Sequence, residues 1–282
     1  MADLGGGDLD GRACPLCAAR QAREWLTKGE YRYLICDCGF VFADVDASTF
    51  EAWNDADFRG DLERFAGRSF EARRQRRYRS RLRRLEAASG SGRLVEVGCN
   101  VGGFLAAARA AGWEAVGVEP VEACAAYARN LGLDVRSSGL QEAGLEAGSF
   151  DAVYSHAVWE HLVDPVGVMS TAAGLLRPGG KLMIDTVNAG ADTVKRMGTG
   201  WRLVDPRVHF CLWTHQTLRR LVEEAGLEVL EMRSHGVRLR PSGAVRLRGG
   251  ARMLEELRKL PLSIAARLRL TGESIAVLAQ KK

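Results

Sequence analysis

The sequence contains no long hydrophobic run. None of the apolar stretches in its 282 residues approaches the roughly 18–20 residues that a membrane-spanning helix requires. The first twelve residues, MADLGGGDLDGR, are polar and acidic and do not resemble a secretory signal. We therefore expect a cytoplasmic protein without a transmembrane segment. In a reducing compartment, its seven cysteines should be thiols or metal ligands rather than disulfides.

Internal repeats and a strong charge imbalance are also absent. The net charge of +5 and the pI near 8.9 permit an anionic substrate or a nucleic acid but require neither. With 282 residues, 46% of them hydrophobic, the chain suits one large domain and a smaller one. The successive segments predict a flexible leader (1–12), a cysteine-bearing domain (13–44), a linking helical segment (45–89) and a large domain (90–282) with an insertion at 236–270.

From residue 93 the sequence alternates between strand and helix patterns. Short apolar strands are predicted at 93–97, 114–119, 133–136, 150–155 and 181–187. Between them, apolar residues recur at helical spacing, as in Phe104, Ala107, Ala108 and Ala111 before Gly112. Such alternation indicates βαβ units and a parallel sheet covered by helices on both faces. The predicted fold class is α/β.

The loop after the first of these strands lacks the G-x-G-x-x-G pattern of dinucleotide-binding proteins. Glu96 is followed instead by Gly98, Gly102 and Gly103, and glycines allow the backbone to approach a ligand closely. Glu119 ends the second strand, where its carboxylate can accept both hydroxyls of a ribose. This pattern favours a nucleoside ligand with a free ribose. The alternative is a tight turn with an incidental surface glutamate.

Four segments in this order resemble the successive motifs of class I (Rossmann-like) S-adenosylmethionine-dependent methyltransferases: LVEVGCNVGGFL, VGVEP, GSFDAVYSHAVWEHLVDP and LLRPGGKLMIDTVN. The resemblance runs from about residue 90 to 234 and returns at the terminal TGESIAVLAQKK. It implies a seven-stranded, mostly parallel sheet and S-adenosylmethionine as the cofactor. It further implies that Glu96, Gly98, Asn100 and Gly102 hold the methionine part, that Glu119 binds the ribose, that Pro120, Leu140 and Gln141 lie at the adenine, and that Ser155 and His156 face the methionine part.

The sequence departs from the family pattern at two positions. Asn100 stands where a glycine is common, and asparagine tolerates left-handed backbone geometry better than most residues. Gly139 replaces an acidic residue that often precedes the adenine loop. Neither change removes the site, but the second leaves recognition of the adenine amine unassigned.

Methyl transfer from a sulfonium requires a positioned nucleophile and, for a hydroxyl acceptor, a group that removes its proton. His209 is our preferred base, because it lies in an aromatic-rich loop that resembles the substrate-facing segment of the family. His161, in the family motif Glu160-His161-Leu162, is the other candidate, with orientation of that loop as its alternative role. We expect the segments 188–213 and 236–270 to cover the acceptor. The second is basic and amphipathic, and would suit a phosphorylated or carrier-linked acceptor or an anionic membrane surface. The alternative is a helix packed outside the sheet with a solvated basic face.

Four cysteines near the beginning of the chain are spaced as two metal-binding turns. Cys14, Cys17, Cys36 and Cys38 are predicted to hold one structural Zn²⁺ ion. Residues 13–44 resemble the zinc ribbon that precedes many bacterial methyltransferases of saccharide and natural-product gene clusters. The second turn is C-x-C rather than C-x-x-C, so reduced cysteines without a metal are the alternative. Cys99, Cys124 and Cys211 are expected to be packing residues.

The favoured function is O-methylation of a small or carrier-linked metabolite, such as a saccharide or natural-product intermediate. An RNA methyltransferase is the alternative, supported by eight arginines between Arg73 and Arg84 in a predicted helix at 60–87. Nine basic against two acidic residues in 236–270 support it too. Against it, the stripe formed by Tyr78, Leu82 and Leu85 makes those arginines a solvated face, and no Asn-Pro-Pro-Tyr motif follows the fourth strand. A scaffold without turnover is a third possibility; no oligomeric state follows from the sequence.

Overall fold

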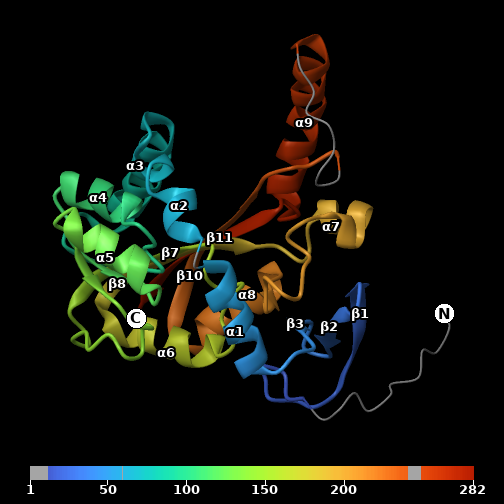
Figure 1. The fold of residues 1–282 in the computed structure, drawn as a ribbon, viewed down its shortest axis with the longest axis horizontal. Helices are drawn as coiled ribbons and strands as arrows, with labels where there is room; N and C mark the ends of the chain where they lie inside the picture. Colours follow the sequence, from blue (N-terminus) through green and yellow to red (C-terminus); the bar gives the residue numbers. More distant parts are fainter. Residues whose placement is uncertain (1–11, 59, 241–248) are drawn as a thin grey trace.

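The computed structural model describes residues 12–58, 60–240 and 249–282. The predicted leader, apart from Arg12, and residues 241–248 of the predicted insertion lie outside this part of the chain. Figure 1 shows a large sheet flanked by helices, a small sheet beside it, and one long helix that projects from the body. No helix in the described ranges has the length and apolar character needed to cross a bilayer.

The large sheet has seven strands in the order β10-β11-β8-β7-β4-β5-β6. The strands are β4 (Arg93–Val97), β5 (Glu114–Val118), β6 (Asp134–Arg136), β7 (Phe150–His156), β8 (Leu176–Val187), β10 (Leu227–His235) and β11 (Ser274–Lys281). All neighbours from β8 to β6 are parallel, whereas β11 is antiparallel to both β8 and β10. The predicted α/β fold with a mostly parallel, seven-stranded sheet is confirmed.

Helices cover both faces of this sheet, as the sequence pattern predicts. One face packs against α3 (Ala72–Ser89) and α4 (Gly103–Ala110), with Leu85, Phe104 and Tyr154 in the core between them. The other face packs against α6 (Pro165–Leu175) and α8 (His215–Glu224) through residues such as Met169 and Leu218. The helix α5 (Glu122–Asn130) buries Ala125 and Ala128 beside α4. Thr214 is the N-cap of α8 and forms a capping box with Thr217.

The segment 60–87 does not form one continuous helix as predicted, although the eight arginines from Arg73 to Arg84 do lie in a single helix. It divides into α2 (Asp61–Phe65), a 3₁₀ turn η1 (Arg68–Phe70) and α3. The break brings buried Ser69 against Gly103, and Gln75 donates hydrogen bonds to the carbonyls of both residues at 3.0 and 3.1 Å. This local contact with the first turn of α4 replaces the continuous helix that composition alone favours.

The small sheet has the order β1-β2-β3-β9. Its strands β1 (Ala22–Lys28), β2 (Tyr31–Cys36) and β3 (Val41–Ala43) come from the cysteine-bearing region. The fourth strand, β9 (Cys211–Leu212), comes from the segment predicted as a long loop. That segment also contains α7 (Asp192–Met197) and η2 (Gly198–Gly200).

The small sheet shares its hydrophobic core with one face of the large sheet. Tyr33, Phe40 and Trp213 belong to the same buried cluster as Val153 and Ile184. The predicted boundary at residue 44 therefore does not separate two packing units, although the chain does continue there into α1 (Ala47–Phe58). The last helix, α9 (Gly249–Arg269), connects β10 to β11.

Candidate functional site

The loop between β4 and α4 has left-handed geometry at three positions. Gly98 and Gly102 have φ of 70° and 78°. A Cβ on Gly98 would lie 2.3 Å from a methyl carbon of Val158, and one on Gly102 would lie 2.4 Å from Leu133. Both positions therefore require glycine. Asn100, the departure from the family pattern, also has a positive φ of 48°, as the sequence led us to expect.

The carboxylate of Glu119 closes this loop against the second strand. Its oxygens accept hydrogen bonds from the backbone N–H groups of Asn100 at 2.8 Å and Val121 at 2.9 Å. Burial raises the pKa of Glu119, and the two N–H groups oppose that rise. Because a carboxylate has about four acceptor positions, Glu119 can still accept hydroxyl donors from a ligand. The structure thus brings Glu119 and the glycine loop together.

Buried polar atoms without a partner gather at the carboxyl edge of the large sheet. Within the part of the chain that the structure describes, Glu96 Oε2, Tyr154 Oη and Ser155 Oγ have no hydrogen-bond partner. Burial, and then the charge of Glu119, raise the pKa of Glu96. An unpartnered buried polar group is costly, so this edge is built for a polar ligand. Parallel sheets bind their ligands at this same edge.

The residues predicted at the adenine lie in the loops after β5 and β6. Leu140 is buried, whereas Pro120 and Gln141 are exposed. A Cβ on Gly139 would lie 2.4 Å from Oε2 of Glu142. The carboxylate of Glu142 therefore occupies the space beside Gly139, where the family pattern often has an acidic residue. Sequence reasoning missed this residue because it is displaced by three positions.

Ser155 and His156 point to opposite faces of β7, because successive strand residues alternate. His156 lies with Asp185 of β8, with 3.6 Å between Nδ1 and Oδ1, while Arg81 of α3 lies 3.1 Å from Nε2. His235 of β10 contacts the other oxygen of Asp185 at 2.8 Å. Burial opposes ionisation of Asp185, but the hydrogen bonds from both histidines lower its pKa. Sequence reasoning missed Arg81, Asp185 and His235, since three separate elements bring them to His156.

The two histidines considered as bases lie side by side. The ring centres of His161 and His209 are 4.9 Å apart, and the rings are steeply inclined to each other at 70°. One nitrogen of each ring and one carboxylate oxygen of Glu160 lie within 4.8 Å of one another. Nδ1 of His209 is 2.8 Å from the carbonyl oxygen of Leu203. A proton on Nδ1 donated to that carbonyl leaves Nε2 as a proton acceptor. Phe58, the last residue of α1, packs against the His161 ring at 5.1 Å.

Burial shifts the pKa values of His161 and Glu160 in opposite directions. It lowers the pKa of His161 to about 3, so His161 is neutral and weakly basic at pH 7. It raises the pKa of Glu160 to about 7, although Thr186 donates a 2.7 Å hydrogen bond to its carboxylate. Glu160 therefore exchanges its proton near neutral pH, within reach of both histidines. Perturbed titrations of this kind are typical of functional sites.

The raised pKa of Glu160 predicts a pH dependence of stability. The folded state holds this proton more tightly than the unfolded state, so the contribution to folding is complete below about pH 4.5 and is lost as pH rises to about 7. Between pH 5 and pH 8, the free energy of unfolding of the wild type should fall by about 2–3 kcal/mol more than that of Glu160→Gln. Denaturant unfolding at each pH measures this difference. Exposed Glu228→Gln is the control, and parallel curves for wild type and Glu160→Gln would contradict the assignment.

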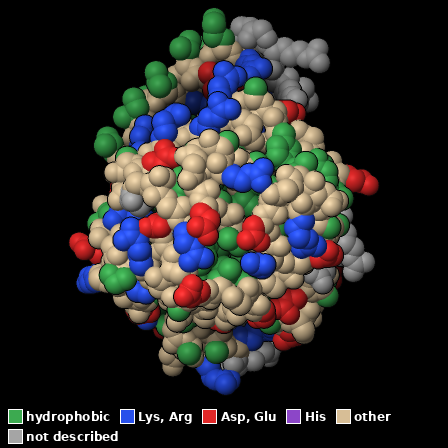
Figure 2. Space-filling model, turned by 90° about the vertical axis from the view of Figure 1, so that its left-hand side faces the viewer, with side chains coloured by type: hydrophobic (Ala, Val, Ile, Leu, Met, Phe, Trp, Pro, Cys, Tyr) green, Lys and Arg blue, Asp and Glu red, His purple; other side chains and the backbone are tan. Residues whose placement is uncertain are grey.

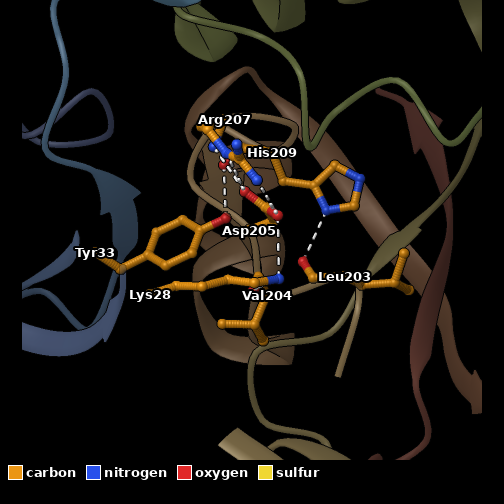
Figure 3. Close-up of polar contacts among 7 residues, drawn as sticks. All are labelled: Lys28, Tyr33, Leu203, Val204, Asp205, Arg207 and His209. Carbon is orange, nitrogen blue, oxygen red and sulfur yellow. Dashed lines mark hydrogen bonds and ion pairs between the residues drawn. The ribbon is translucent and has the colours of Figure 1, made fainter. Parts of the chain in front are cut away.

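The small sheet holds the turn that carries His209 (Figure 3). The hydroxyl of Tyr33 donates a 2.7 Å hydrogen bond to the carbonyl oxygen of His209. Lys28 donates to the carbonyl oxygen of Val204 at 3.2 Å and pairs with Asp205 at 3.0 Å. Residues from β1 and β2 therefore fix the backbone on both sides of the turn.

The four N-terminal cysteines converge on one point. The sulfurs of Cys14 and Cys38 are 3.8 Å apart and those of Cys17 and Cys36 are 3.6 Å apart, with all four within 4.8 Å of one another. A tetrahedral zinc with Zn–S bonds of about 2.3 Å requires sulfurs roughly 3.8 Å apart, whereas a disulfide requires about 2.05 Å. The sulfur positions therefore fit a zinc ion, including those of the shortened C-x-C turn. Cys99, Cys124 and Cys211 are buried elsewhere in the protein.

Comparison with known protein families gives one model match. A family described as a methyltransferase domain matches residues 70–232. Similar curated proteins include the ubiquinone biosynthesis O-methyltransferases of Xanthomonas axonopodis pv. citri (34% identity over 113 residues) and Hahella chejuensis (36% over 104 residues). These alignments cover 37% and 34% of this chain and 46% and 43% of the relatives. The chain thus spans less than half the length of these relatives.

Solved structures with a similar fold have low sequence identity. A Thermotoga maritima protein described as an S-adenosylmethionine-dependent methyltransferase, possibly acting on histamine, aligns with a TM-score of 0.53 and 21% identity over 83% of this chain and 99% of its own. A Haemonchus contortus phosphoethanolamine N-methyltransferase 2 aligns with a TM-score of 0.57 and 16% identity over 86% of this chain and 62% of its own. These likenesses support the fold alone.

Proposed function

Because the chain belongs to the methyltransferase domain family, whose model matches residues 70–232, we propose that it transfers a methyl group from S-adenosylmethionine to a hydroxyl group. The acceptor would be a small or carrier-linked metabolite, such as a saccharide or natural-product intermediate. The observation that carries the proposal is the pair of buried carboxylates, Glu96 and Glu119, beside a left-handed glycine loop at the carboxyl edge of the sheet. The relatives named as O-methyltransferases support oxygen as the acceptor atom.

The residues at this edge fit the functional groups of the cofactor. Glu119 would accept hydrogen bonds from the ribose hydroxyls, and Glu96 would accept hydrogen bonds from the ammonium group of the methionine part. Arg81 lies near Glu96 and is the cation available for the methionine carboxylate. Leu140 and Pro120 would pack on the adenine, and a side-chain oxygen of Glu142 or Gln141 would accept a hydrogen bond from its amino group. In this proposal His156 supports Arg81, while Gly98, Asn100, Gly102 and Ser155 line the methionine part.

The Glu160–His161–His209 cluster would deprotonate the acceptor. When bound, S-adenosylmethionine supplies an electrophilic methyl carbon, so the protein mainly orients the acceptor and removes its proton. Nε2 of His209 would accept the hydroxyl proton, while the bond from Nδ1 to Leu203 holds the ring in place. A nearby Glu160, ionised above about pH 7, would stabilise the resulting imidazolium. His161 would orient the loop, because a pKa of about 3 makes it a poor base.

We also infer that Cys14, Cys17, Cys36 and Cys38 bind one zinc ion. Four thiolates fill a tetrahedral shell and leave no open position for a substrate, so the metal would be structural. Its role would be to stabilise the small sheet and, through Tyr33 and Lys28, the turn that carries His209.

The arginines of α3 give less support to an RNA acceptor than their number suggests. Arg84 pairs with Glu231 at 2.9 Å, Arg81 contacts His156, and Arg74 lies over the ring of Phe65. Of the stripe formed by Tyr78, Leu82 and Leu85, the two leucines are buried against the sheet and Tyr78 is half-buried. A metabolite acceptor is therefore favoured. Incubation with a panel of hydroxyl acceptors, followed by a search for a mass increase of one methyl group, tests this choice directly.

Cofactor affinity tests the site itself. Glu119→Gln exchanges one carboxylate oxygen for a donor and removes the charge, so it should lose about one charge-assisted hydrogen bond, worth roughly 1.5–3 kcal/mol. Calorimetry should then show a Kd for S-adenosylmethionine raised about 10- to 150-fold. Exposed Glu122→Gln, three positions later, is the matched control and should bind like the wild type. Unchanged affinity in a folded Glu119→Gln protein would reject the assignment.

A further inference from the structure

The projecting helix α9 exposes a continuous apolar stripe. Its members are Met253, Leu254, Leu257, Leu260, Ile264 and Leu268, and each is 50–81% exposed. Their spacing places them within about one third of the helix circumference. The opposite side of α9 attaches it to the protein: Ala266 is buried, and its carbonyl accepts a 2.8 Å hydrogen bond from Ser234 of β10. Figure 2 shows these hydrophobic side chains along the helix at the top of the molecule, with basic side chains beside them.

Basic residues border the stripe on both sides. By helical spacing, Arg258 and Arg269 follow one edge and Arg267 the other. All three are exposed, and none forms an ion pair with a described residue. The two acidic residues of the helix, Glu255 and Glu256, both pair with Lys259, at 2.7 and 3.0 Å. The apolar stripe is thus framed by positive charge that no residue in the described part of the chain neutralises.

The apolar stripe and the arginines beside it indicate which kind of partner α9 can bind. A second copy of the chain would bring two rows of arginines together, which like-charge repulsion disfavours. A protein partner would need a groove to receive a convex, freestanding helix. A fluid anionic bilayer adapts to such a helix, accepts the apolar side chains below the headgroups and pairs with the arginines. We propose that α9 lies in the headgroup region of an anionic membrane, parallel to its surface.

The position of α9 relates this surface to the sheet. Strand β10 is parallel to β8, because both are antiparallel to β11. The carboxyl end of β10, from which the chain leads to α9, therefore lies at the same edge as the loop of Gly98 and Gly102. Ala266 near the end of α9 contacts Ser234 of β10, so the attached end of the helix lies at this edge as well. The inference does not depend on the identity of the methyl acceptor.

Flotation with lipid vesicles tests the proposal. The full-length protein should bind vesicles of phosphatidylcholine with roughly one third phosphatidylglycerol, and should bind pure phosphatidylcholine at least about tenfold more weakly. Leu257→Glu with Ile264→Glu should lower the partition coefficient for the anionic vesicles more than about tenfold. Arg258→Ala with Arg267→Ala should lower it roughly fivefold for each arginine, and added salt should weaken wild-type binding.

Matched controls distinguish binding through α9 from an effect of losing any exposed leucine or arginine. Leu131→Glu with Leu230→Glu changes two exposed leucines outside α9, and Arg73→Ala with Arg83→Ala changes two exposed arginines of α3. Both control proteins should stay within about twofold of the wild type. Equal losses in the controls, or full binding by the Leu257/Ile264 variant, would overturn the proposal. The proposal would also be overturned if the wild type did not bind vesicles but formed a dimer, and if the Leu257/Ile264 variant were monomeric.

Discussion

Replacing His209 by asparagine is expected to lower kcat for methyl transfer by roughly 10²–10⁴, the usual contribution of a general base. Asparagine keeps a side-chain N–H near the position of Nδ1, so the hydrogen bond to Leu203 can persist while the basic Nε2 is lost. The affinity for S-adenosylmethionine should not change, because His209 does not lie in the glycine loop. Steady-state kinetics across pH, together with calorimetric binding of the cofactor, measure the two effects separately.

The histidine at the start of α8 supplies a control for this experiment. His215 lies six positions after His209 and outside the cluster, so His215→Asn should retain the wild-type kcat and pH profile. A full rate in His209→Asn would contradict its role as the base. His161→Asn would then become the informative variant, with a loss of rate and no loss of cofactor affinity.

The double substitution Cys14→Ser with Cys17→Ser is expected to abolish zinc binding and to destabilise the protein by about 3–5 kcal/mol, or about 10 °C in Tm. Two of four thiolates cannot hold a structural zinc, and the small sheet would lose the point at which its turns meet. Methyl transfer should fall as well, since Tyr33 and Lys28 of this sheet hold the turn of His209. Cofactor affinity should remain, because Glu96 and Glu119 belong to the large sheet.

Elemental analysis of protein purified without chelator measures the metal directly, with an expected content of about one zinc per chain. Cys124→Ser, a change of a buried cysteine outside the tetrad, should keep the metal. Wild-type protein that is stable and free of zinc would support the alternative of four reduced cysteines. Zinc retained by the double variant would show that other ligands hold it.

The local patterns of the sequence were sufficient to predict five of the seven strands of the large sheet, whereas the seven-stranded architecture followed from the family resemblance. Strands β4, β5 and β7 are short, mostly apolar runs bounded by turn residues, and α4 ends at Ala110, shortly before the glycine that the spacing marks. The positive φ of Asn100 also follows from a local rule, because few side chains tolerate that geometry. Such features depend on neighbouring residues in the chain, so they can be predicted without tertiary contacts.

The contacts that complete the candidate site could not be predicted in this way. Asp185 meets His156 and His235 only after four strands (β7, β8, β11 and β10) have paired, and Arg81 reaches them from a helix whose arginines resemble a solvated surface. The two residues of β9 are too few to give a strand pattern, and they form a strand because β3 presents an open edge. These contacts join residues that are far apart in the sequence, so the local composition of each segment does not predict them.

The pairing of β3 with β9 has a consequence for the order in which the protein folds during synthesis. Strands β1 and β2 are joined by a tight turn and can pair as soon as they leave the ribosome. The outer edge of β3 has no partner until Cys211 and Leu212 emerge, after most of the large sheet has been made. Nascent chains normally complete their N-terminal units first. Here the small sheet, three of whose strands are translated before the large sheet, is completed only after most of the large sheet, and its open strand edge is exposed to other nascent chains in the meantime.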